Sequence, residues 1–235
     1  MREVATNTYG TLSSAPDSLI VNSIYDYLSS ILTSFKGKDC ENENAITNRL
    51  CKTLNSRKPS EYPFFFHHQN IESEKENTST DFAVFGTFAY AVENDIEDDD
   101  SPPLIKFEAK RLNSKLPKSR EREYVCGEYK NGMCLKNSGG IERFKNGRHG
   151  ADVSNAAIIG YLQSDSVEFW FTRVNKWIED QISTSSDSRL KWDATDLLVS
   201  NSLDKPLSNY ISTSSRLSGS RIRLNHFWID FTNEN

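Results

Sequence analysis

The sequence predicts a mixed α/β fold in which helices flank a central β-sheet, and three observations predict it. Two stretches near the N-terminus place apolar residues at helical spacing. Strand-like runs rich in aromatic and β-branched residues then follow in quick succession. Near the C-terminus, two alternating runs surround Ser218-Gly219-Ser220, which is typical of a β-hairpin.

The helices are predicted from apolar spacing and from the residues that stop them. Over 16–35, Ile20, Ile24 and Ile31 recur on one face, and Gly37 follows as a stop. A second helix is expected from about 42 to 55. Further along the chain, the same reasoning predicts a short helix near 140–145 and an amphipathic helix over 167–182.

The strands are predicted in chain order. Three consecutive strands are expected at 62–71, 80–92 and 104–110. The stretch 156–163 is either a buried strand or the end of a buried helix, because a short apolar run does not distinguish the two. A strand at 196–200 then precedes the terminal hairpin, whose arms are expected at 210–217 and 221–231.

Length and composition favour one domain. A chain of 235 residues, 36% of them hydrophobic, is long enough for one sizeable core. We expect a single domain over 1–235, with its core at about 40–163, an N-terminal helix within 1–36, and a C-terminal helix and strands in 164–235. No apolar run approaches the roughly 18 residues of a membrane span, and the N-terminus lacks a secretory h-region. The four cysteines form no CxxC pattern, which favours reduced thiols in a cytoplasmic protein.

Charge is distributed unevenly along the chain. The net charge of −5 argues against a nucleic-acid partner, but residues 105–148 hold 12 Lys and Arg against 5 Asp and Glu. The preceding residues 1–104 hold 8 against 17. A basic surface beside an acidic cluster suits an enzyme that acts on phosphodiesters, since cations bind the backbone and carboxylates bind a metal. A solvated basic loop is the alternative.

The strongest chemical signal is the strand-like run 105–110. Because side chains alternate along a strand, Glu108 and Lys110 share one face. Asp81 opens the preceding strand. Carboxylates and a backbone carbonyl, here that of Ala109, are the ligands that Mg²⁺ prefers, and Lys110 could orient or deprotonate a water or stabilise developing charge. A surface Glu/Lys pair on an exposed sheet face is the alternative interpretation.

The second helix offers one further acid to this site. On a helix that advances 100° per residue, Glu43 falls in the apolar stripe of Ile46 and Leu50, whereas Glu41 falls on the solvated side. A carboxylate on a buried stripe needs a compensating partner, such as a metal or Lys110. The alternative is that Glu43 is a wet first-turn acid favoured by the helix dipole. Because neighbouring carboxylates repel one another, we also expect that Glu108→Gln can raise the melting temperature of the metal-free protein.

This constellation resembles the PD-(D/E)xK superfamily, the restriction-endonuclease-like nucleases. Asp81, Glu108 and Lys110 match the family pattern, and Glu43 matches its common helix acid. The resemblance implies a restriction-endonuclease-like α-β-β-β-α-β core over about 40–163, here with a C-terminal β-hairpin added. It also implies Mg²⁺, or Mn²⁺, bound through the two acids with Lys110 at the water. Thr80 stands where the family often has proline, at a variable position.

Other stretches carry softer signals. Residues 139–147, 157–161 and 221–231 are similar to uncharacterised prokaryotic proteins of this superfamily from phage-defence neighbourhoods. His67 and His68 point to opposite faces of one strand and cannot chelate one metal together. His149 could meet a phosphate, but a loop histidine is the favoured interpretation. The candidate phosphate contacts are Lys106, Arg143, Lys145 and Arg148, with simple solvation as the alternative.

The sequence therefore predicts a cytoplasmic, Mg²⁺-dependent nuclease that acts on DNA in preference to RNA, in a setting of prokaryotic phage defence. Its predicted catalytic residues are Glu43, Asp81, Glu108 and Lys110, and its predicted metal ligands are Asp81, Glu108, the Ala109 carbonyl and Glu43. Two alternatives stay open. One is a catalytically inactive module that binds nucleic acid or a partner protein of a defence complex; the other is a purely structural partner protein.

Overall fold

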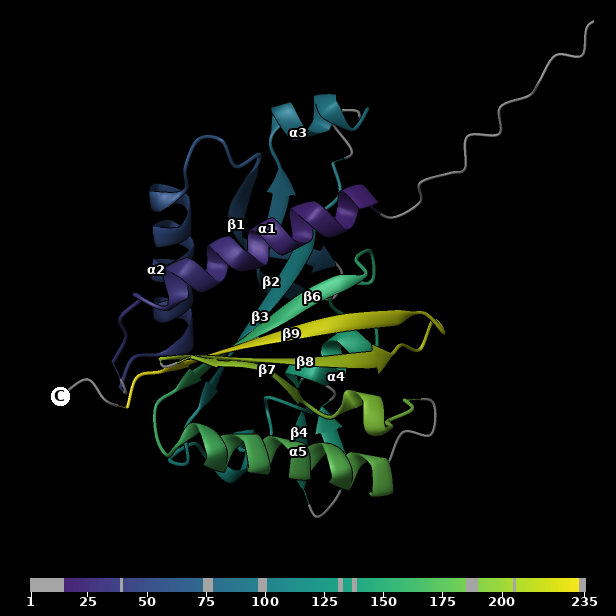
Figure 1. Cartoon of the computed structure of the whole chain (residues 1–235). Helices are drawn as coiled ribbons and strands as arrows, with labels where there is room; N and C mark the ends of the chain where they lie inside the picture. Colours follow the sequence, from purple (N-terminus) through teal and green to yellow (C-terminus); the bar gives the residue numbers. More distant parts are fainter. Residues whose placement is uncertain are drawn as a thin grey trace, which may run out of the picture.

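A mixed sheet of seven strands organises the molecule (Figure 1). The computed structural model describes residues 15–38, 40–73, 78–96, 101–130, 133–136, 139–184, 190–204 and 206–232. In spatial order the strands are β1 (Phe64–Ser73), β2 (Thr78–Gly86), β3 (Ile105–Leu112), β6 (Asn155–Leu162), β9 (Arg221–Asp230), β8 (Leu207–Ser215) and β7 (Val199–Asp204). The predicted mixed α/β fold with a sheet flanked by helices is confirmed.

Strand direction changes across the sheet. The three central strands β3, β6 and β9 are parallel, and the outer pairs β1–β2, β2–β3, β9–β8 and β8–β7 are antiparallel. The predicted terminal hairpin is confirmed, since β8 and β9 pair from Leu207↔Ile229 to Ser215↔Arg221. The short strands β4 (Glu128–Lys130) and β5 (Met133–Lys136) form a separate two-stranded sheet.

Helices cover both faces of the sheet and bury a core on each (Figure 1). Helices α1 (Ala15–Leu32) and α2 (Glu43–Arg57) pack on one face, which we call the α1 face. Helices α4 (Gly140–Lys145) and α5 (Val167–Thr184) pack on the other, the α5 face. All four helices were predicted at nearly these bounds. On α5, Trp170 and Trp177 are buried among the core residues.

Alternation along β3 decides which side chains reach which face. Phe107 and Ala109 belong to the core of the α1 face, where Phe107 stacks on Phe82 with ring centroids 4.4 Å apart. Glu108 and Lys110 therefore point to the α5 face. Glu108 aligns with Ile158 of β6, which lies in the core of that face. The burial of all six residues 105–110 makes β3 an interior strand.

Two predicted strands differ from the structure. The strand expected over 80–92 ends at Gly86, and the chain continues as helix α3 (Phe88–Glu93). A Cβ on Gly86 would lie 2.3 Å from the Tyr90 ring, so the helix packs back closely on the strand end. The strand expected at 196–200 begins only at Val199, because Asp193 and Asp196 form a capping box that starts the 3₁₀ turn η3 (Ala194–Asp196). A further 3₁₀ turn, η2 (Lys118–Arg120), follows β3.

Other sequence expectations are resolved more simply. The stretch expected at 156–163 as strand or helix is strand β6. Cys40, Cys51 and Cys126 are free thiols. Among the described residues, no helix has both the length and the apolar character needed to cross a membrane.

Candidate functional site

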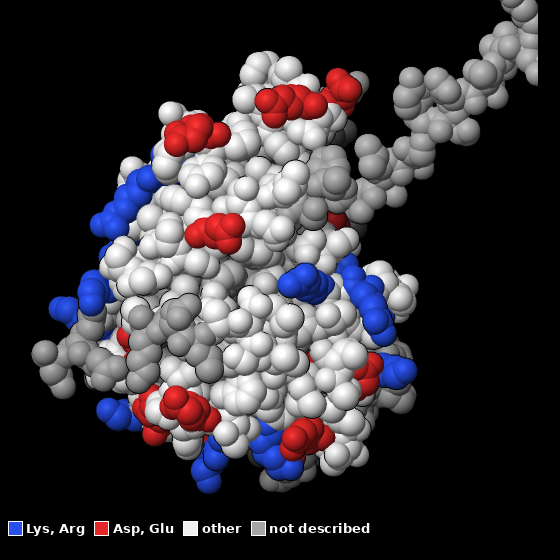
Figure 2. All heavy atoms as spheres, in the orientation of Figure 1, with Lys and Arg blue, Asp and Glu red and all other residues white. Residues whose placement is uncertain are grey.

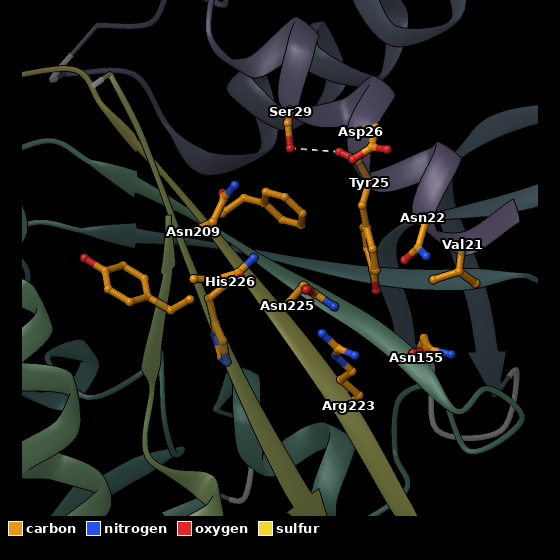
Figure 3. Close-up of a pocket in the computed structure, with 13 residues that line it drawn as sticks. Val21, Asn22, Tyr25, Asp26, Ser29, Asn155, Asn209, Arg223, Asn225 and His226 are labelled. Atoms are coloured by element: carbon orange, nitrogen blue, oxygen red, sulfur yellow. Dashed lines mark hydrogen bonds between the residues drawn. The ribbon is translucent and has the colours of Figure 1, made fainter. Parts of the chain in front are cut away.

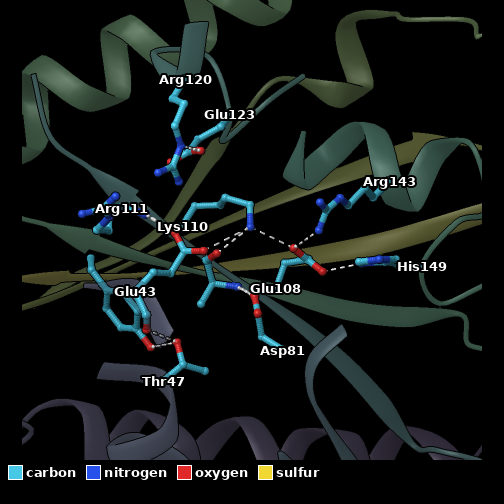
Figure 4. Close-up of polar contacts among 12 residues, drawn as sticks. Glu43, Thr47, Asp81, Glu108, Lys110, Arg111, Arg120, Glu123, Arg143 and His149 are labelled. Carbon is cyan, nitrogen blue, oxygen red and sulfur yellow. Dashed lines mark hydrogen bonds and ion pairs between the residues drawn. The ribbon is translucent and has the colours of Figure 1, made fainter. Parts of the chain in front are cut away.

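The face of β3 that meets the α5 side buries an acid and a lysine together. Glu108 has no exposed surface, and Lys110 is 6% exposed. The Lys110 Nζ donates to Glu108 Oε2 at 3.0 Å and to the Ala109 carbonyl at 2.7 Å (Figure 4). An ammonium thus contacts two of the oxygens predicted to bind a metal.

Helix α2 brings a second acid to the same lysine. Glu43 Oε1 lies 3.6 Å from Lys110 Nζ, and Glu43 Oε2 accepts a hydrogen bond from the Arg111 backbone N–H at 3.1 Å. Asn42 caps the helix by accepting from Ala45 N at 2.8 Å, which fixes where the first turn begins. Glu41 instead pairs with Arg49 outside this site, at 3.0 Å. The helical-stripe argument therefore selected the acid that faces the lysine.

Asp81 completes a group that we call the acid–lysine cluster: Glu43, Asp81, Glu108 and Lys110. From β2, Asp81 Oδ2 accepts a hydrogen bond from the Ala109 backbone N–H at 2.6 Å. Burial raises the pKa of Asp81 to about 7; the negative charges of Glu108 and Glu43 add to this rise, and Lys110 opposes it. The side chains expected to converge, although far apart in the sequence, lie together.

Glu108 sits among cationic donors rather than among acids alone. Lys110 and Arg143 both reach Oε2, the latter at 3.2 Å, and His149 Nδ1 contacts Oε1. Burial alone would raise the pKa of Glu108, but these neighbours outweigh it and hold the pKa well below its ordinary value. Neutralising Glu108 would remove the anion that these neighbours share, although Lys110 would keep Glu43 and the Ala109 carbonyl. The lowered pKa argues against the expected rise in melting temperature of Glu108→Gln, which stays a prediction.

The charge state of Lys110 narrows its role. Burial by itself would lower the pKa of the lysine, but Glu108, Glu43 and Asp81 raise it above its ordinary value. A protonated lysine cannot accept a proton from water. Of the roles predicted for Lys110, stabilising negative charge and orienting a water fit the protonated lysine of this arrangement, and proton removal would require that neighbouring acids first be neutralised, for example by a metal.

Tight packing of α4 places Arg143 and His149. A Cβ on Gly139 would lie 2.1 Å from the Cys126 backbone, and one on Gly140 would lie 2.8 Å from the Tyr124 carbonyl oxygen. Only glycine lets the start of α4 approach this turn so closely. After α4, Gly150 has a positive φ of 62° and follows His149 directly. The contact of His149 with Glu108 was not predicted, because the sequence shows only a glycine after the histidine, which indicates a turn and no partner.

The four candidate phosphate contacts differ in where they lie. Lys145 is fully buried and paired with Asp196 at 2.7 Å, and Lys106 is 4% exposed and paired with Glu72 at 3.0 Å and Asp152 at 2.7 Å. Lys145 has no exposed surface and does not reach a phosphate in this structure, so that prediction does not hold. Lys106, like Lys110, keeps a small exposed fraction among its acids, and its contact with a phosphate stays a prediction. The Arg143 side chain is 28% exposed beside Glu108, and Arg148 is half-buried.

Other sequence candidates lie away from the cluster. In β1, His67 and His68 align with Ala83 and Phe82 of β2, and the two rings point to opposite faces, as predicted. His67 packs edge-on against Phe85. The end of the acidic stretch 93–100 lies outside the described residues, from 97 onward.

The fit of this site to a divalent ion depends on Lys110. In the part of the chain that the structure describes, no three Asp, Glu, His or Cys side chains are placed to hold a metal as they stand. The donor chemistry nevertheless suits Mg²⁺, since carboxylate and carbonyl oxygens from Glu43, Glu108 and Ala109 surround one point. That point carries the Lys110 ammonium, a monovalent cation that satisfies the same oxygens.

Comparison with known proteins yields no relative. The chain matches no protein-family model, no curated protein and no solved structure at a significant level.

Proposed function

We propose that the protein is a Mg²⁺-dependent nuclease that hydrolyses phosphodiester bonds, with DNA as the preferred substrate. One observation carries the proposal: oxygens from Glu43, Glu108 and the Ala109 carbonyl converge on the Lys110 ammonium, with Asp81 hydrogen-bonded beside them. Carboxylates that gather around a buried cation on a strand pair are expensive to maintain without a function.

The order of elements supports a restriction-endonuclease-like core. Helix α2 precedes β1, β2 and β3, and helix α4 precedes β6, which matches the implied α-β-β-β-α-β order once two insertions are set aside: helix α3 between β2 and β3, and strands β4 and β5 between β3 and α4. Strand β6 returns parallel to β3, next to the acid–lysine cluster. In this proposal β7, β8 and β9 extend the core sheet on the far side of β6.

The proposed metal would be held by Asp81, Glu108 and the Ala109 carbonyl, with Glu43 beside them. When bound, it supplies a Lewis acid for the phosphate and lowers the pKa of a water. The chain's own residues have separate tasks. Lys110 binds and orients the nucleophilic water or neutralises charge on the phosphate, and Arg143 offers a second cation at the same carboxylate.

One observation favours the second candidate, a catalytically inactive module of the same fold. Both oxygens of Glu108 are already bonded to Lys110, Arg143 and His149, so a metal must displace at least one of these donors. A protein that keeps these contacts would bind nucleic acid or a partner protein without cutting. Action in prokaryotic phage defence, in the cytoplasm, remains part of the proposal and depends on the family resemblance alone.

A cleavage assay with matched variants tests the proposal. Plasmid DNA, single-stranded DNA and RNA are incubated with the purified full chain and Mg²⁺ or Mn²⁺, and then with EDTA. We expect metal-dependent cleavage that falls at least about 100-fold in Lys110→Ala and Asp81→Ala. Lys115→Ala, at an exposed lysine beyond the end of β3, is the control and should cut normally.

The outcomes separate the candidate functions. Cleavage that survives EDTA, or that persists in both cluster variants, contradicts the proposed nuclease and indicates a contaminating enzyme or another site. Tight binding of nucleic acid with no cleavage under any metal supports the binding module instead.

A further inference from the structure

A second group of polar side chains lies on the opposite face of the sheet from the acid–lysine cluster. A cavity of about 380 Å³ lies against α1 and the sheet strands beside it. Asn225 of β9 aligns with Ala157, whose side chain belongs to the core of the α1 face, whereas Glu108 aligns with Ile158 of the α5 face. The cavity and the cluster therefore lie on different sides of the sheet.

Asparagines dominate the lining of this cavity, which we call the asparagine cavity (Figure 3). They come from α1, β6, β7, β8 and β9: Asn22, Asn155, Asn201, Asn209 and Asn225. Arg223 is the cation among the described lining residues, and Asp26 of α1 is the acid. Tyr25 also lines the cavity and donates to the Ala156 carbonyl at 3.2 Å.

One of these amides is left with an unpaired polar atom. The buried Oδ1 of Asn209 has no hydrogen-bond partner among the described residues. Asn225 is 9% exposed, and its side chain interacts with that of Tyr25, which also lines the cavity. A buried amide without a partner lowers stability, and most buried polar groups in proteins are paired. A ligand that supplies a hydrogen-bond donor would satisfy the Asn209 oxygen.

The side chains that line the cavity indicate which chemical class of ligand it could bind. Each asparagine amide presents a donor and an acceptor side by side, which matches the edge of a nucleobase. A guanidinium such as that of Arg223 matches a phosphate, and a carboxylate such as that of Asp26 accepts from sugar hydroxyls. The volume lies within the range of small-molecule sites. We propose that the asparagine cavity binds a nucleoside monophosphate, with the amides at the base and Arg223 at the phosphate.

The surface around the cavity suits a single nucleotide better than a long strand. Figure 2 shows this face of the molecule, where Lys and Arg gather mainly along the sides and the centre is largely uncharged. A backbone of many phosphates needs a continuous basic surface. One arginine in a mostly neutral cavity fits one phosphate. The proposal goes beyond the nuclease function and does not depend on it.

Binding of nucleotides by the full chain tests the proposal, in EDTA so that no cleavage occurs. Isothermal titration with AMP, GMP, CMP and UMP should show saturable one-to-one binding by at least one of them. Arg223→Gln should weaken that binding at least about tenfold while leaving the weaker binding of the matching nucleoside unchanged. Asn225→Leu should abolish binding of both. Arg221→Gln, two residues away on the same strand and outside the cavity lining, is the matched control and should bind normally.

Thermal melts confirm that each variant is folded. Asn225→Leu replaces the amide with a side chain of similar volume, and Tyr25 Oη keeps its bond to the Ala156 carbonyl, so the melting temperature should change little. A 5′-phosphorylated oligonucleotide separates the two sources of the ligand. Binding of the oligonucleotide through the same residues identifies a strand end, and binding of the mononucleotide alone identifies a free nucleotide; both support the site.

Three results overturn the proposal. One is that none of the four nucleotides binds at millimolar concentration. Another is that binding is unchanged in both Arg223→Gln and Asn225→Leu. The last is that inorganic phosphate or a monosaccharide binds as tightly as the nucleotides. None of these results bears on metal-dependent cleavage at the acid–lysine cluster, so failure of either proposal is recognised separately.

Discussion

Two buried lysines, Lys110 and Lys145, are paired with acids in very different ways. Lys145 meets one acid, Asp196, whose oxygens also accept from Ser214 Oγ at 2.6 Å and from the Asp193 backbone N–H at 2.9 Å. The Lys145 Nζ also lies 4.7 Å from the centre of the Trp192 ring. This pair balances its charges and fills its hydrogen bonds, which is typical of a structural ion pair.

Lys110 instead stands among three acids on two strands and a helix. Burial, with the neighbouring acids adding to it, raises the pKa of Asp81 to about 7. Lys145 has a single carboxylate partner, whereas the three carboxylates around Lys110 offer oxygens that could also bind another cation. Both lysines are buried, so the number of acids around each lysine, rather than burial, distinguishes the candidate site from the Lys145–Asp196 pair.

The largest expected effect comes from removing each lysine. Lys145→Met should lower the free energy of unfolding by about 3–5 kcal/mol, because it leaves the buried Asp196 carboxylate without a countercharge. Lys110→Met should also destabilise the protein, but Mg²⁺ should recover part of the loss by replacing the ammonium among the same oxygens. Chemical denaturation with Mg²⁺ or EDTA measures both. If Mg²⁺ changed the stability of Lys110→Met and Lys145→Met equally, the acid–lysine cluster would not differ from the Lys145–Asp196 pair in its ability to bind a metal.

The next largest effect on stability is expected at His226, a histidine that is buried in its neutral form on the α5 face. Burial lowers its pKa to about 3, and the neutral ring bonds Tyr124 Oη at 2.8 Å and Ser212 Oγ at 2.9 Å. The unfolded chain binds a proton near 6.5 and the folded one does not. Stability is therefore full above 6.5 and declines as pH falls toward 3, by up to about 1.4 kcal/mol per unit.

A pH series of denaturation curves for the wild type and His226→Gln measures this slope. The difference should be clearest just below 6.5, before most carboxylates titrate. Equal slopes in the two proteins would mean that His226 accepts a proton in the folded state, and the core of the α5 face would then be wetter than the structure indicates.

A smaller effect tests the charge balance inside the acid–lysine cluster. In EDTA, Asp81→Asn should raise the free energy of unfolding by about 1–2 kcal/mol above neutral pH, because the raised pKa makes the ionised form costly. The sign is opposite for Glu108→Gln, which should lower it, because the pKa of Glu108 is held down by cationic neighbours. The cost of ionised Asp81 should appear as pH rises from 3.8 to about 7. Thermal melts across that range compare the variants, and equal signs would contradict the assigned balance.

More of the fold and of the acid–lysine cluster could be predicted from the sequence than of the other buried ion pairs. Long periodic elements such as α1 and α5, and the strand alternation of β3, depend on local patterns that a single sequence contains. The acid–lysine cluster was predictable because Glu108 and Lys110 are neighbours on one strand. Lys145 was wrongly predicted to contact phosphate because its partner Asp196 lies 51 positions away, and no local sequence pattern indicates such an ion pair.

The asparagine cavity and the contact of His149 with Glu108 were not predicted, because each is formed by side chains from several helices, strands and loops. The asparagine cavity draws on five elements, each contributing a single amide that is unremarkable in its own segment. His149 likewise reaches Glu108 from a loop 41 positions further along the chain. Strand register aligns only some of these residues, such as Asn155 of β6 with Arg223 of β9, and the others are placed by the packing of helices and loops on the sheet.

The smallest effect on stability gives the most selective test of the comparison, at two neighbouring acids. Glu41 pairs with Arg49 at the surface, so Glu41→Gln should cost less than about 1 kcal/mol and leave cleavage unchanged. Glu43→Gln keeps the side-chain volume and can still accept from the Arg111 N–H, so its cost should be similarly small. It removes one negative charge beside Lys110, however, and should reduce metal-dependent cleavage at least about tenfold. If both variants cut equally well, Glu43 is a helix-terminal acid like Glu41, and the cluster reduces to the two strands β2 and β3.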